Sequence, residues 1–173
     1  MKKIYYLLSL GVLIAFNSAC ERKTPVREDV WVPIYRDKSE TSKVTNKEAI
    51  AVTEGGKIYA YKQYIFQIEQ NKGIHVYQVV NQIPRPLTFI EVLGAQEISI
   101  KDDHLYTNNF EDIVVLNIEQ PSNVSIVSTI ENAFKLNSLN RPPTKGYFQC
   151  VDENKGSVVG WEKQHNVAAD CMY

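Results

Sequence analysis

The sequence predicts an all-β fold. Between residues 48 and 162, short runs of β-branched and aromatic residues alternate with turn-forming residues, which is the pattern of short strands. The order of these runs returns after about 40 residues, which indicates an internal repeat. Hydrophobic residues make up 44% of the chain and charged residues 23%, as is ordinary for a folded domain. The length of 173 residues fits one modest domain.

The first repeat is expected over residues 55–92, as four short antiparallel strands. These strands are predicted at residues 58–61, 64–68, 74–80 and 87–92. Lys62-Gln63 is the expected turn between the first two strands, and Gly73 opens the third. Pro84-Arg85-Pro86 is expected to break the chain before the fourth strand, because proline cannot donate a hydrogen bond within a sheet.

The second repeat is expected over residues 93–130 and has the same order of strands. They are predicted at residues 98–100, 104–107, 112–118 and 124–130, with turns at 101–103 and 121–123. When the repeats are aligned, Phe66 matches Tyr106, Val76 matches Val115 and Pro84 matches Pro121. The spacing of matched positions falls from 40 to 37, so the turns are shorter in the second repeat while the strands keep their order.

A unit of four strands and about 40 residues has the size of a β-propeller blade. The motifs Gly73–Tyr77 and Asp112–Ile118, each followed by a proline-bearing turn, resemble the LVIVD repeat of bacterial surface and envelope proteins. The resemblance covers residues 50–162, although Gln78 and Asn117 stand where that family favours aspartate. It implies a β-propeller-like architecture and no particular biochemical activity.

Two repeats are too few for a closed propeller, which needs about four or more blades. We expect the two sheets to face each other as a small sandwich. The alternatives are a partial propeller and a ring assembled from several copies. A C-terminal β-hairpin is predicted over residues 147–162, with its turn at 154–156. The β-repeat domain as a whole is therefore expected over residues 48–173.

The N-terminus has the features of an export signal. Met1-Lys2-Lys3 is a short basic start, and the apolar run at residues 4–16 is too short to span a bilayer. Asn17-Ser18-Ala19 before Cys20 resembles a bacterial lipobox, in which the cysteine receives a lipid and residues 1–19 are removed. The alternative is an ordinary secretory signal cut near Ala19. We expect a cell-envelope protein anchored to a membrane through Cys20; the residues do not distinguish the inner from the outer membrane.

Residues 20–47 are expected to form the lipidated N-terminus and a tether to the domain, because most of them are polar or charged. An apolar island at residues 30–35 interrupts this stretch and contains Trp31 and Tyr35. We expect the island to dock on the domain or to add an edge strand. The alternative is an exposed recognition segment.

The chain has three cysteines. If Cys20 carries a lipid, Cys150 and Cys171 remain, and an exported protein resides where disulfides persist. We therefore predict a disulfide between Cys150 and Cys171; the alternative is one thiol in a strand and one in the C-terminal tail. No histidine or further cysteine stands at metal-ligand spacing from this pair, so no metal site is predicted.

No catalytic or cofactor site is predicted. The three histidines, His75, His104 and His165, have no histidine or cysteine three or four residues away. The acidic pairs Asp102-Asp103 and Glu111-Asp112 lie at predicted turns, where acidic residues are common. The chain has no phosphate-binding loop and no nucleophile or zinc-protease motif.

Three tyrosines in the first repeat form a candidate binding face: Tyr59, Tyr61 and Tyr64. Aromatic rings can stack on sugars or pack in a protein interface. The alternative is that these tyrosines are ordinary strand residues that pack in the core, since aromatic residues are common in strands.

The charge balance bears on the class of partner. The chain carries 19 basic and 20 acidic residues, a net charge of −1, which excludes a simple electrostatic nucleic-acid binder. The sequence contains no motif that indicates a particular reaction. We expect a non-catalytic envelope lipoprotein whose β-repeat domain binds a protein partner at the membrane surface. The alternative function is binding of a glycan or another extracellular ligand through the tyrosine-rich face.

Overall fold

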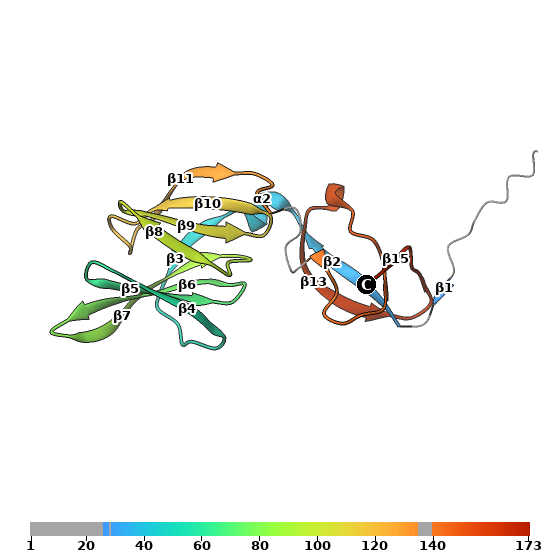
Figure 1. The fold of residues 1–173 in the computed structure, drawn as a ribbon, viewed down its shortest axis with the longest axis horizontal. Coiled ribbons are helices and arrows are strands. Elements are labelled where there is room, and N and C mark those ends of the chain that lie inside the picture. The colour runs from blue at the N-terminus through green and yellow to red at the C-terminus, as the bar shows by residue number, and fades with distance from the viewer. Residues whose placement is uncertain (1–25, 28, 135–139) are drawn as a thin grey trace, which may run out of the picture.

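The predicted all-β class is confirmed. A computed structural model of the chain describes residues 26–27, 29–134 and 140–173, and Figure 1 shows strands arranged in several sheets. The described helical elements are the short helix α2 (Lys38–Thr41) and the 3₁₀ turn η3 (Glu153–Lys155). Within the described ranges, no helix is long and apolar enough to cross a membrane.

The first sheet contains five antiparallel strands in the order β3-β7-β6-β5-β4. Four of them follow one another as the predicted first repeat, and β3 joins them at the β7 edge. The strands are β3 (Val44–Lys47), β4 (Gly55–Tyr61), β5 (Tyr64–Glu69), β6 (Gly73–Val80) and β7 (Ile83–Val92). The strand positions at 58–61, 64–68, 74–80 and 87–92 lie within β4 to β7.

The second sheet contains four antiparallel strands in sequence order, β11-β10-β9-β8. The strands are β8 (Ile98–Lys101), β9 (His104–Asn109), β10 (Asp112–Asn117) and β11 (Ser125–Ile130). Asp102 and Asp103 form the turn between β8 and β9, with φ values of 48° and 59°. Two positive φ angles in a two-residue loop give the turn that suits a β-hairpin.

The two sheets pack face to face as a sandwich, as Figure 1 shows. Alternate residues of each strand point between the sheets, because successive side chains of a strand point to opposite faces. Phe66 and Ile68 of the first sheet and Leu105 and Leu116 of the second are fully buried there. The remaining buried members of this core are Ile74, Val76, Ile90, Val92, Ala95, Ile98, Ile100, Val114 and Ile118.

β4 and β8 lie next to each other and run in the same direction. Lys57 Nζ is 2.5 Å from Glu97 Oε2 near the beginning of the two strands. Lys62 Nζ is 2.6 Å from Asp103 Oδ1 near their ends. Residues of β4 are therefore neighbours of residues about 40 positions later in the chain, which are their counterparts in the repeat alignment.

The expected break at Pro84-Arg85-Pro86 is wrong. Ile83 to Val92 form one strand, and the turn before it is Asn81-Gln82, where both φ angles are positive. Pro84 and Pro86 are tolerated because β3 pairs only with residues 89–92, so the proline-bearing half of β7 has a free edge.

The C-terminal hairpin expected over residues 147–162 is also wrong. The third sheet has the order β13-β2-β12-β15, so β2 (Val30–Arg36) lies between β12 (Tyr147–Phe148) and β13 (Ser157–Gln164). β2 pairs antiparallel with β13 along its length and parallel with β12 at Trp31 only. The apolar island of β2 takes the inner place because Val30 becomes fully buried there.

The expected tether does not extend to residue 47. β2 and β3 are strands of two different sheets, and β1 (Val26–Arg27) pairs with β14 (Val167–Ala168). The island at residues 30–35 does dock by adding a strand, but this strand is internal to the third sheet rather than at its edge. Strands of the folded domain thus occur well before residue 48.

Candidate functional site

The tyrosines chosen as a candidate binding face do not form an exposed strip. Tyr59 and Tyr61 on β4 share the face of Phe66, which points toward the second sheet. The hydroxyl of Tyr59 donates to the carbonyl of Ile100 at 3.4 Å, and the hydroxyl of Tyr61 accepts from the backbone N–H of Asp103 at 3.1 Å. These two side chains tie the sheets together.

Tyr64 lies at the same seam. It lies opposite Tyr61 in the β4–β5 pair, and both tyrosines pack against the core. Tyr64 also makes an edge-on ring contact with Phe66, at 6.3 Å between centroids. Tyr59 is 37% exposed, and Tyr61 and Tyr64 are half-buried, at the seam of the sandwich. Strand propensity alone could not separate this position from a binding face.

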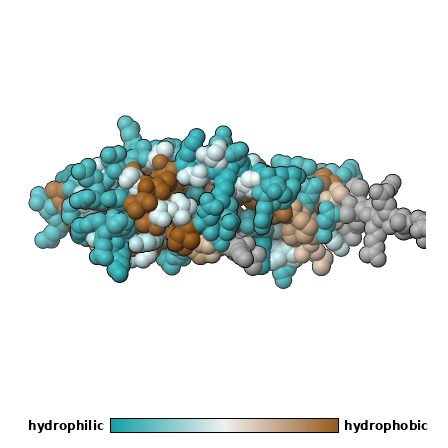
Figure 2. Space-filling view, turned by 90° about the horizontal axis from the view of Figure 1, so that it is seen from above, coloured by the Kyte–Doolittle hydropathy of each residue, from teal (hydrophilic) through white to brown (hydrophobic). Residues whose placement is uncertain are grey.

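An apolar surface that the sequence did not single out lies on the outer face of the second sheet. We use this name for the side chains that point away from the first sheet on β8 to β11, principally Ser99, Tyr106, Asn108, Ile113, Val115 and Ile130. Figure 2 shows apolar side chains gathered on the upper side of the molecule, where this sheet lies.

A hollow of about 420 Å³ opens on this outer face. Tyr106 and Phe134 stand at it with 38% and 45% of their surface exposed, and Ile113 lies between β9 and β11 beside them. The polar side chain of Asn108 is engaged, since its Oδ1 accepts from the backbone of Gln96 and its Nδ2 donates to Gly94. The hollow therefore offers mainly apolar contact.

The predicted disulfide between Cys150 and Cys171 is present, with the two Cα atoms 5.3 Å apart. It joins the segment after β12 to β15 (Cys171–Met172), the strand that pairs with β12. The bond fixes the C-terminal tail to the third sheet. Cys20 lies outside the described residues, so its lipidation stays a prediction.

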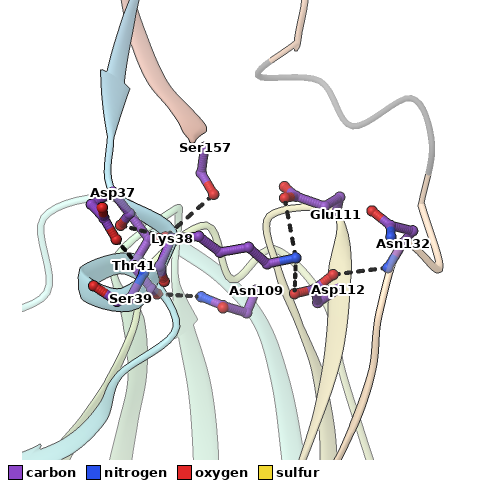
Figure 3. A network of polar contacts seen from close by, with 9 residues as sticks. All are labelled: Asp37, Lys38, Ser39, Thr41, Asn109, Glu111, Asp112, Asn132 and Ser157. Atoms are coloured by element: carbon purple, nitrogen blue, oxygen red, sulfur yellow. Dashed lines mark hydrogen bonds and ion pairs between the residues drawn. The ribbon is translucent and has the colours of Figure 1, made fainter. Parts of the chain in front are cut away.

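The third sheet meets the sandwich through a network of polar side chains around α2 (Figure 3). Lys38 Nζ lies 3.2 Å from Asp112 Oδ2 and 3.9 Å from Glu111 Oε1. Burial acts to lower the pKa of Lys38, but the hydrogen bond to Asp112 and the nearby negative charges outweigh it and raise the pKa. Asp112 also accepts from the backbone N–H of Asn132 at 2.8 Å. The acidic pair 111–112 thus binds a lysine.

Three buried polar side chains belong to the same junction between the sandwich and the third sheet. The Thr41 hydroxyl donates to Ser157 Oγ at 3.3 Å, and Asn109 Nδ2 donates to the Thr41 carbonyl at 2.9 Å. Gly156 has a φ of 101°, and a Cβ there would lie 2.2 Å from the carbonyl oxygen of Arg36. Glycine is therefore needed where β13 begins against the end of β2.

A polar cleft lies beside the junction, between the sandwich and the third sheet. It has a volume of about 770 Å³ and includes Glu111 and Asn132 on the sandwich side and Glu153, Asn154 and Lys155 on the other. Figure 3 shows the Glu111 carboxylate beside the Lys38 ammonium group at this junction. Neutral and charged polar groups of both signs line the cleft, which suits a ligand rich in hydroxyl groups.

Glu69 and His75 form a buried acid–histidine pair that the sequence did not indicate. Glu69 accepts hydrogen bonds from His75 Nε2 at 2.9 Å, from the backbone N–H groups of Thr53 and Glu54, and from the Thr53 hydroxyl. Burial raises the pKa of Glu69, but these hydrogen bonds outweigh it and lower the pKa to about 2. The pair fastens the segment before β4 onto the outer side of the first sheet.

The remaining candidate side chains lie apart from one another, each with its own partner. The Nδ1 atom of His104 lies 2.7 Å from the carbonyl of Asp102, and His165 pairs with Asp29 at the surface. Asp103 binds Lys62 across the sheets. Within the described ranges, no group of three or more acidic, histidine or cysteine side chains is arranged to hold a metal ion.

The chain was compared with known proteins. No protein-family model matches it, and no curated protein or solved structure shows significant similarity to it.

Proposed function

We propose that this chain is a non-catalytic envelope lipoprotein whose β-sandwich binds another protein through the outer face of the second sheet. The basic start, the apolar run at residues 4–16 and the small residues before Cys20 support the anchoring part. Only residues 21–25 separate Cys20 from β1, so a lipid on Cys20 would hold β1 within about 20 Å of its attachment point.

The observation that carries the binding function is the apolar hollow with Tyr106 and Phe134 at its rim. Large aromatic side chains left exposed together on a folded domain mark an interaction surface. A hollow of about 420 Å³ can receive one or two large apolar side chains of a partner. The polar groups near it, such as Asn108, are engaged within the chain, so the partner contributes apolar contact at the centre.

The structural roles of the titratable groups support the non-catalytic part of the proposal. Glu69 and His75 are buried and hold a segment in place, and Lys38 and Asp112 join the sandwich to the third sheet. Each group has a partner that explains its position without a substrate.

The anchoring part is tested by Cys20→Ser. The substitution removes the acceptor of the lipid, so the protein should leave the membrane fraction or retain its signal segment. Fractionation of cells and the intact mass of the product measure both outcomes. A mass that differs from the unsubstituted product only by the sulfur-to-oxygen exchange, together with unchanged membrane association, would contradict the lipid anchor.

The binding part is tested by hydroxyl-radical labelling of the full chain in native membranes and after purification in detergent at low concentration. We expect Tyr106 and Phe134 to be labelled several-fold less in membranes, because a partner covers them there. Tyr173, which is 45% exposed at the C-terminus, is the internal control and should be labelled equally. Equal labelling of Tyr106 in both samples would contradict a partner on this face.

A second candidate function rests on the polar cleft between the sandwich and the third sheet. We place the binding of a hydroxyl-rich ligand such as a glycan in this cleft rather than at the tyrosine-rich face. The hydroxyl groups of Tyr59 and Tyr61 are engaged in hydrogen bonds between the sheets. A glycan array probed with the full chain tests it. Binding that disappears in Glu153→Ala and persists in Glu162→Ala would support the cleft; no binding by the unsubstituted chain would exclude the glycans on the array.

A further inference from the structure

We infer that the partner of the outer face of the second sheet is a second copy of this chain, docked head to tail. In this arrangement the outer face of the second sheet of one copy packs on the outer face of the first sheet of the next. The inference rests on the proposed function, because it names the partner for the surface described there.

The first argument is that the outer face of the second sheet repeats a surface that the chain already covers. In the repeat alignment, Tyr106 matches Phe66 and Val115 matches Val76. Phe66 and Val76 lie on the inner face of the first sheet, beneath the second sheet, and are fully buried. Tyr106 occupies the equivalent place on the second sheet but is 38% exposed. Val115, at the other matched position, is only 7% exposed, so the part of this face that the described residues leave uncovered is the part around Tyr106.

The second argument is that the chain also carries the covering surface in exposed form. The second sheet covers the first with a face that includes Ile98. Ile98 matches Ile58, which lies on the outer face of the first sheet and is 65% exposed. Ile50 and Val52 are exposed as well, on the segment that Glu69 fastens to this side of the sheet. On the outer face of the first sheet, the exposed part lies at Ile58 and at the segment with Ile50 and Val52, whereas His75 and Phe89 on the same face are buried. Exposed apolar side chains of both halves of the internal interface therefore occur on opposite sides of the sandwich.

The third argument is charge complementarity. Within the chain, Glu97 and Asp103 at β8 pair with Lys57 and Lys62 at β4. A head-to-tail contact that repeats the internal one places β8 of one copy beside β4 of the next. The acidic groups at β8, which include Asp102, then again face the two lysines. Opposite charges at the rim of an apolar contact favour this register.

The shape of the molecule permits the contact. Figure 1 shows the third sheet beyond one end of the sandwich strands, so it does not lie over either outer face. A head-to-tail interface generates a ring when the rotation from copy to copy closes. Each copy supplies two sheets, and closed propellers have about four to eight, so two to four copies would complete a ring.

The test uses the full chain purified from membranes in detergent, with mass measured by native mass spectrometry. We expect the unsubstituted chain to form assemblies of two to four copies. Tyr106→Arg and Ile58→Arg each place a charge on one half of the interface at an exposed position, so each variant alone should be monomeric. Val80→Arg, at an exposed position at the end of β6, is the control and should assemble like the unsubstituted chain.

Mixing the two monomeric variants gives the sharpest outcome. One variant retains an intact first-sheet face and the other an intact second-sheet face, so an equimolar mixture should form dimers and nothing larger. A monomeric unsubstituted chain, or single variants that still assemble, would overturn the inference. If that chain is monomeric while Tyr106 is protected in membranes, the proposed function stands with a different partner; if Tyr106 is also unprotected, both fail.

Discussion

In the sequence, Tyr59 and Tyr61 suit either a binding face or packing between sheets, and the structure shows the contacts that they make between the sheets. Their hydroxyl groups bond to the backbone of Ile100 and Asp103 across the seam of the sandwich. The sequence indicates that they stand in a strand, but the direction in which that strand faces depends on the packing of the second sheet. Glu69 and His75 were missed for a similar reason, because residues on neighbouring strands meet only once their register is set.

Replacing Tyr61 with phenylalanine tests its role at the seam. Tyr61→Phe removes the acceptor for the Asp103 N–H group, so the free energy of unfolding should fall by about 1 kcal/mol. Urea denaturation measures the change. Tyr77→Phe is the matched control, since no hydrogen bond of its hydroxyl is found among the described residues, and it should change stability less. Equal stability of Tyr61→Phe and the unsubstituted chain would contradict the structural role.

Glu69 predicts a dependence of stability on acid. Its pKa in the folded chain is about 2, below the ordinary value of 4.5, so its contribution is fully present above pH 4.5 and is lost as the pH falls toward 2. Glu69→Gln should lower the free energy of unfolding at neutral pH by about 3 kcal/mol, since each tenfold change in proton affinity corresponds to about 1.4 kcal/mol.

The measurement is urea unfolding of both proteins from pH 7 to pH 2. The difference between them should shrink as the pH falls below 4.5, because protonation removes the advantage of the carboxylate. Glu48→Gln, at an exposed position, is the control and should follow the unsubstituted chain throughout. Two pH profiles that stay parallel for Glu69→Gln would contradict the assigned hydrogen bonds.

At the scale of elements, local patterns predicted most strands and the turns at 62–63 and 101–103, because both depend on neighbouring residues. The pairing of distant elements was not predictable in this way. β2 inserts between β12 and β13 although more than a hundred residues separate them in sequence. Even so, Trp31 and Tyr35 indicated that this segment would not stay in water, and Pro33 is tolerated because β12 contacts β2 only at Trp31.

The disulfide should hold the third sheet together. Cys150 and Cys171 are 21 residues apart, and closing such a loop stabilises a folded chain by about 3 kcal/mol in the chain-entropy model. We expect replacement of both cysteines by alanine to lower the melting temperature of the third sheet and to speed hydrogen exchange at β12 and β15. Exchange in the β5 and β6 strands of the sandwich is the internal control. Unchanged exchange at β12 would show that the strands alone hold the tail.

At the scale of the whole molecule, a sandwich and a disulfide-linked sheet are joined by α2 and its polar network (Figure 3). The repeat alignment predicted the two stacked sheets of the sandwich but not this second part, which is assembled from both ends of the chain. The apolar hollow could not be predicted from the sequence either, because Tyr106 and Phe134 come together only when β9 and the segment after β11 have folded against each other.

The claim that the outer face of the second sheet binds a protein is tested most directly by site-specific photo-cross-linking in intact cells. A photoreactive amino acid replaces Tyr106 in one strain and Val80, which has similar exposure, in another. We predict a discrete cross-linked product from position 106, whose mass identifies the partner as a second copy or another protein, and no such product from position 80. The absence of a product at position 106, or the same product from both positions, would contradict the account.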